Sequence, residues 1–153
     1  MGATRVGAAQ VEAALVIHDL DHARAALAAS SGLGIAVLLV TAPGAVRSGG
    51  PAYLKAVIDR AAEGFPSSQW SALIDCGDRP GDVFASLDAG WRRLAFTGAP
   101  VAGQRLSEIA AGRGASLEHL PASSLDLAFE ADPRSASRTW LSAVRVAAPS
   151  SLC

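Results

Sequence analysis

The segment Ala14–Leu27, ALVIHDLDHARAAL, contains the transition that decides the fold. Its first five residues, ALVIH, form an apolar run of the length typical of a buried strand. The residues after them place Leu20, Ala23 and Leu27 at helical spacing on one face. The polar cluster HDLDH lies between the two patterns. The segment therefore predicts a strand, a short turn and a helix.

The same succession of an apolar run and a helical pattern recurs along the chain, with glycine and proline between the patterns. The distance between successive apolar runs leaves room for one helix each. The predicted strands are 14–18, 35–40, 71–75, 93–97 and 115–120, and the predicted helices are 20–30, 51–63, 81–89, 103–111 and 133–144.

Alternating strands and helices indicate a parallel sheet, and its central strands are apolar on both faces, as a sheet covered by helices requires. The predicted fold class is α/β: a single three-layer domain of about five parallel strands with flanking helices, flavodoxin- or Rossmann-like. An incomplete βα barrel is the alternative, because the repeat length also suits barrel units. The domain is expected to span residues 1–146, with a flexible tail at 147–153.

Composition narrows the class of protein. Half of the 153 residues are hydrophobic, 18% are charged and the net charge is -1. This balance provides no basic surface for nucleic acid, and no apolar run approaches the roughly 20 residues of a membrane span. We therefore expect a cytoplasmic protein without nucleic-acid or membrane partners. The few charges also favour a homo-oligomer, with association surfaces near Trp140 and along the segment that contains Phe65 and Trp70.

Ligands of open parallel sheets bind beyond the carboxyl ends of the strands. The segments that follow the predicted strands hold the polar clusters of the chain: HDLDH, TAPGAVRSGG, DCGDRPGD, TGAPVAGQR and LPASSLD. The sequence thus predicts that all five clusters lie at one edge of the sheet.

The loop from Thr41 to Pro51 suits a small anionic molecule. Its glycines can present backbone N–H groups, and Arg47 a guanidinium, to a phosphate. The Walker sequence GxxxxGK[ST] is absent, and a flexible glycine loop is the alternative reading. The loops after strands 71–75 and 93–97 repeat this composition. The predicted ligand-binding residues are Thr41, Gly44, Arg47, Gly49, Gly50, Gly77, Asp78, Thr97 and Gly98.

Two interpretations compete for HDLDH. His18 and His22 lie four residues apart, the spacing at which two imidazoles on one helix can bind the same metal ion. His18 ends the predicted strand, however, and this breaks the helical spacing. In the other interpretation Asp19 caps the helix and Asp21 lies in its first turn. We expect the second arrangement, without a metal ion.

The cluster DCGDRPGD allows a similar pair of interpretations. Cys76 could be a reactive thiol near a helix N-terminus, but a lone cysteine in a strand is usually a packing residue. Asp78 suits the N-cap of the following helix, with Pro80 and Asp82 in the first turn.

Three of these features together resemble haloacid-dehalogenase-like phosphohydrolases. LVIHDLD is similar to that family's first motif, a strand ending in DxD. Thr41 ends the next strand, as the second motif does, and GDRPGD resembles the fourth motif, GDxxxD. The resemblance covers less than half of the chain and implies Mg²⁺-dependent phosphoryl transfer. It implies a nucleophile at Asp19, a general acid/base at Asp21, further catalytic roles for Thr41 and Lys55, and Mg²⁺ held by Asp19, Asp78 and Asp82.

Two hypotheses follow from the sequence. The first is a small binding or accessory domain without a cofactor, which holds an anionic small molecule at its glycine-rich edge or which only assembles. The second is the Mg²⁺-dependent phosphohydrolase. The second requires the carboxyl groups of Asp19, Asp21, Asp78 and Asp82 to converge, and the first does not.

Overall fold

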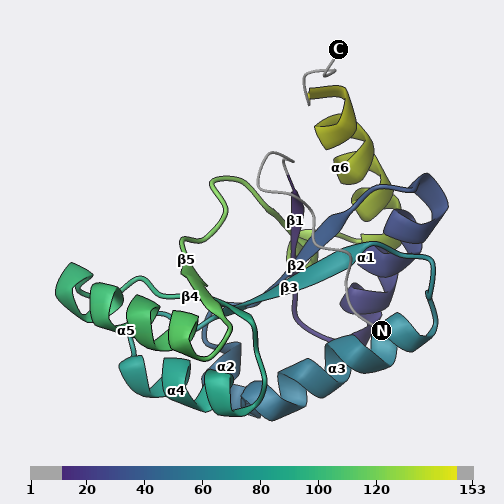
Figure 1. Cartoon of the computed structure of the whole chain (residues 1–153). Helices are drawn as coiled ribbons and strands as arrows, with labels where there is room; N and C mark the ends of the chain where they lie inside the picture. Colours follow the sequence, from purple (N-terminus) through teal and green to yellow (C-terminus); the bar gives the residue numbers. More distant parts are fainter. Residues whose placement is uncertain (1–11, 148–153) are drawn as a thin grey trace.

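A computed structural model of the protein describes residues 12–147, which form one sheet of six parallel strands with flanking helices (Figure 1). The predicted α/β class is confirmed. The elements are β1 (Ala13–Ile17), α1 (Leu20–Leu33), β2 (Val37–Thr41), α2 (Ala45–Gly49), α3 (Pro51–Glu63), β3 (Trp70–Asp75), α4 (Pro80–Asp88), β4 (Arg93–Ala95), α5 (Pro100–Gly112), β5 (Ser116–Glu118), β6 (Leu125–Asp126), the 3-10 helix η1 (Leu127–Phe129) and α6 (Pro133–Ala147).

The strand order is β5-β4-β3-β2-β1-β6. From β1 to β5 each new strand joins the same edge, whereas the flavodoxin order places β1 between β2 and β3. The chain then returns across the sheet, and β6 pairs with the free side of β1. The edge strands β5 and β6 do not pair with each other, so the sheet is open and is not closed into a barrel.

The main core lies between the sheet and the helices. Alternate strand residues such as Leu15, Leu39 and Leu94 are fully buried there, as the two-residue period of a strand requires. Helix α1 turns a face of buried alanines to this core, and small side chains let a helix approach the sheet closely. It also packs against α3 and α6. The opposite face of the sheet carries a smaller buried cluster of Ala14, Leu38, Val40, Leu73 and Ala95.

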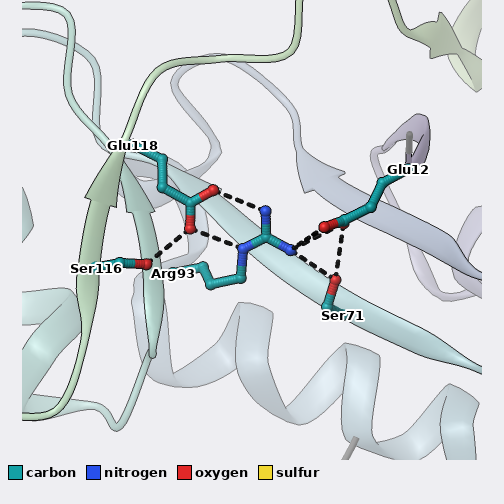
Figure 2. Close-up of polar contacts among 5 residues, drawn as sticks. All are labelled: Glu12, Ser71, Arg93, Ser116 and Glu118. Carbon is teal, nitrogen blue, oxygen red and sulfur yellow. Dashed lines mark hydrogen bonds and ion pairs between the residues drawn. The ribbon is translucent and has the colours of Figure 1, made fainter. Parts of the chain in front are cut away.

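A polar network crosses this second face of the sheet (Figure 2). The Arg93 guanidinium donates two hydrogen bonds of 2.7 Å to Glu118 on β5. It also donates to both carboxylate oxygens of Glu12, at 3.0 and 2.9 Å, and to the Ser71 hydroxyl at 2.8 Å. Ser116 donates to Glu118 at 2.8 Å. One cation thus joins β4 to β3, β5 and the residue that precedes β1.

The charges of this network stabilise one another. Burial raises the pKa of Glu118, but hydrogen bonds from Arg93 and Ser116 outweigh it and lower the pKa below its usual value. The hydrogen bonds from Arg93 to Glu118 and Glu12 also raise the pKa of the guanidinium against the effect of burial. Arg93 and Glu118 are therefore both charged at neutral pH.

Some elements differ from the predicted ones. The expected glycine loop contains the five-residue helix α2, and β6 and η1 have no predicted counterpart. Ala147, expected in the flexible tail, is the last residue of α6, and residues 148–153 of that tail lie outside the described part of the chain.

The expected association surfaces are not exposed apolar patches. The side chains of Trp140, Phe65 and Trp70 are partly buried and pack against the main core. The most exposed large apolar residues of the described chain are Phe129 and Val101, at 85% and 69%. Homo-oligomerisation through these segments stays a prediction. None of the helices within residues 12–147 is long and apolar enough to cross a membrane.

Candidate functional site

The cluster HDLDH forms the junction between β1 and α1. Asp19 is the N-cap of α1, and its Oδ1 accepts the backbone N–H of His22 at 2.8 Å. The Asp21 side chain is 91% exposed, in the first turn. The capping interpretation is therefore confirmed.

Loss of this cap should be measurable. Asp19→Ala is expected to lower the free energy of unfolding by about 1 kcal/mol, because the N–H of His22 loses its acceptor. Asp21→Ala is the matched control, and its cost should stay within about 0.5 kcal/mol. Urea unfolding of the two variants measures both values, and equal losses would contradict the capping role of Asp19.

The first histidine of the cluster has a partner far away in the sequence. His18 Nε2 lies 2.7 Å from Oδ1 of Asp126, the last residue of β6. The same Oδ1 accepts the backbone N–H of Ala128 at 2.9 Å. The pairing of β6 with β1 sets Asp126 opposite Val16, two residues before His18. Pairing of the edge strand β6 with β1 thus creates a histidine–carboxylate pair at the carboxyl edge of the sheet.

The second histidine fixes the backbone of the first. His22 Nδ1 accepts the backbone N–H of His18 at 3.1 Å, and the two rings meet edge to face with centroids 5.6 Å apart. The His22 side chain is only 13% exposed, whereas that of His18 is 35% exposed. His22 is therefore a supporting residue, and His18 is the one that reaches solvent.

Two hollows meet at His18. An open groove of about 560 Å³ is lined by His18, Ala42, Pro43, Gly44, Ala45, Arg47 and Ser48. We call it the His18–Ser48 groove. A hollow of about 20 Å³, enough for about one water molecule, lies between His18 and side chains of α3 that include Tyr53 and Leu54. A ligand-sized space thus adjoins the histidine–carboxylate pair.

The predicted anion loop contributes part of this groove. Gly44 and Arg47 line it. Arg47 is exposed and forms no ion pair with any residue of the described chain. Gly49 lies against the ring of Tyr53, and Gly50, with φ of 83°, joins α2 to α3. Neither of these two lines the groove.

Thr41 is a buried residue that connects two strands. It is 1% exposed, and its hydroxyl accepts the backbone N–H of Asp75 at 3.0 Å. This bond ties the end of β2 to the end of β3. The Thr41 side chain lines the small hollow but not the groove.

The remaining predicted ligand residues lie in the loops after β3 and β4. Hydrogen bonds hold these two loops together. The N–H of Gly77 donates to Oδ1 of Asp75 at 2.9 Å, and its carbonyl accepts the N–H of Thr97 at 2.8 Å. The Phe96 ring covers Gly98, where an added Cβ would clash with the ring. Asp78 is exposed and is not the predicted cap, because Arg79 occupies the N-cap position of α4. These residues do not line the His18–Ser48 groove.

Cys76 is a packing residue. Its side chain is 3% exposed, and its sulfur lies 3.6 Å from the Ser86 hydroxyl. Burial raises the pKa of this thiol to about 11. A thiol with this pKa is almost fully protonated at neutral pH and is a poor nucleophile.

The geometry required by a haloacid-dehalogenase-like site is not present. Asp19 follows β1 and Asp78 follows β3, and β2 lies between these strands. Lys55 pairs with Asp59 on the surface of α3 at 2.9 Å. Oδ2 of Asp82 lies 3.8 Å from Nε of Arg79. Between residues 12 and 147, no three His, Cys, Asp or Glu side chains form a group that could hold a metal ion. The residues present do not fit the implied Mg²⁺.

Sequence reasoning missed two features of the site. His18 was considered only as a metal ligand, and Asp126 was not singled out within LPASSLD. A two-residue strand has no periodic pattern, so nothing local indicated its pairing with β1. Comparison with models of known protein families and with curated proteins gives no match for this chain.

Proposed function

We propose that the protein binds a small anionic molecule in the His18–Ser48 groove. The observation that carries the proposal is the placement of Arg47 on this groove without an acidic partner among the described residues. An arginine beside a concavity can form charge-assisted hydrogen bonds with a carboxylate or phosphate.

The size and setting of the groove support a small ligand. Its volume of about 560 Å³ is within the range of small-molecule sites. The nearby acids are already engaged, since Asp19 caps α1 and Asp126 holds His18. The groove is open to solvent, which favours modest affinity that falls as salt concentration rises.

Calorimetric titration with inorganic phosphate tests the proposal. Wild type should bind without added Mg²⁺, and Arg47→Gln should weaken binding about tenfold, because a hydrogen bond to a charged group contributes about 1.5 kcal/mol or more. Arg105→Gln removes the same charge from α5, where the side chain is also exposed and forms no ion pair with a described residue. It should leave phosphate affinity unchanged. Absence of binding, or equal losses in the two variants, would refute the proposal.

A further inference from the structure

We propose that His18 and Asp126 form a general-base pair that hydrolyses small anionic esters bound in the His18–Ser48 groove, with water as the second reactant. The inference rests on the proposed anion binding and adds a reaction to it. Three observations carry it: the 2.7 Å contact with Asp126, the place of His18 on the groove, and the presence on the same groove of Arg47, which forms no ion pair with a residue from 12 to 147.

The hydrogen bonds determine which ring nitrogen is basic. Oδ1 of Asp126 accepts the N–H of Ala128, so the same oxygen faces His18 as an acceptor. Nε2 of His18 must then be the donor and carry the proton. The lone pair of the neutral ring therefore lies on Nδ1, which forms no hydrogen bond with any residue from 12 to 147.

The other two histidines lack this arrangement. His22 uses Nδ1 to accept the N–H of His18, so that nitrogen is occupied. His119 is exposed, and the structure shows no hydrogen bond from its ring to a described residue. Only His18 combines an orienting carboxylate with a position on a groove, as general-base histidines do.

The proposed step balances without any further reactant. Nδ1 of His18 takes a proton from water, and the water oxygen forms a bond to the ester carbonyl carbon while the C=O π pair moves onto the carbonyl oxygen. That pair re-forms the C=O bond when the leaving group departs. Asp126 stabilises the imidazolium that results. The bond to the leaving oxygen then breaks, the oxygen takes its electron pair, and the imidazolium returns the proton. The products are an acid and an alcohol. Arg47 holds the anionic group of the ester, and Asp126 is a positioning residue.

Hydrolysis of two chromogenic esters tests the inference. The probes are mono-4-nitrophenyl terephthalate, which is anionic and whose carboxylate cannot reach its own ester group, and 4-nitrophenyl benzoate, which is neutral. Wild type should show the higher kcat/KM for the anionic ester. His18→Gln should lose about 100-fold of this kcat/KM, the lower range of general-base contributions. Arg47→Gln should reduce the preference for the anionic ester. His119→Gln is the matched control and should leave both rates unchanged.

A second measurement separates positioning from folding. Nitrogen-15 NMR of wild type should show the proton of His18 on Nε2. Asp126→Asn should reduce the fraction of this tautomer and lower kcat/KM. Asparagine can still cap η1, so the variant should keep its fold. A proton on Nδ1 in wild type, no hydrolysis above the buffer rate, or an equal loss in His119→Gln would overturn the inference. If phosphate still binds in these cases, the proposed function stands; if phosphate does not bind, both fail.

Discussion

Replacing Arg93 with methionine should lower the free energy of unfolding by about 3 kcal/mol. The change leaves the carboxylates of Glu12 and Glu118 without their shared cation on one face of the sheet (Figure 2). Their side chains are 21% and 27% exposed. Breaking a buried pair costs about 3–5 kcal/mol, and partial exposure favours the lower end of this range. Urea unfolding at neutral pH measures the loss.

Arg113→Met is the matched control for this experiment. Arg113 pairs with Asp88 at 2.9 Å, but the two side chains are 43% and 73% exposed. A surface pair of this kind contributes about 0–1 kcal/mol. Equal losses in Arg93→Met and Arg113→Met would contradict the role of the network. Adding Glu12→Gln and Glu118→Gln to Arg93→Met should recover part of the stability, because two unpaired charges disappear.

The network should also give stability an acid-side pH dependence. The folded-state pKa of Glu118 lies below its usual value. Its contribution is therefore fully present above the unfolded pKa of about 4.3 and is lost as the pH falls through the lowered folded pKa. Wild type should lose more stability than Arg93→Met as the pH falls over this window. Parallel pH profiles would contradict this assignment.

Leu127→Ala should lower the free energy of unfolding by about 3 kcal/mol, within the range for leucines of a core. Leu127 is fully buried in the first position of η1, directly after Asp126. The 3-10 helix contacts both β1 and α6. The substitution should therefore also weaken the placement of Asp126 beside His18, and amide hydrogen exchange across β6 should become faster.

Phe129→Ala provides the control within the same short helix. Phe129 is 85% exposed, so its truncation should change stability by no more than about 0.5 kcal/mol. Urea unfolding of both variants gives the comparison. A larger loss for Phe129→Ala than for Leu127→Ala would show that β6 is not held by the core below it.

The long elements were predictable because their signals are local. The run ALVIH and the helical spacing after it correspond to β1 and α1. The five-residue helix α2 was not predictable, since its short sequence lies between Gly44 and Gly50 and has the composition of a loop. Strand β6 contains only Leu125 and Asp126, and its register with β1 depends on packing of distant segments.

The parts of the candidate site that depend on local sequence were also predictable, and those that depend on distant contacts were not. The edge of the sheet and the contribution of Gly44 and Arg47 followed from loop composition. The contact of His18 with Asp126 spans 108 positions, and no local pattern reports a contact of that kind. In the sequence, the carboxylates after β1 and β3 resembled two motifs of one family, which would meet at a single site. The strand order separates them, because β2 lies between β1 and β3.

Mapping phosphate binding by amide NMR tests the central claim most directly. Titration of ¹⁵N-labelled protein with inorganic phosphate should shift the amide signals of His18, Gly44 and Arg47 most strongly, because these residues line the groove. The signals of Gly77 and Gly98, which belong to the loops after β3 and β4 outside the groove, should move little. Largest shifts at Gly77 and Gly98, or no saturable shift anywhere, would contradict an anion site in the His18–Ser48 groove.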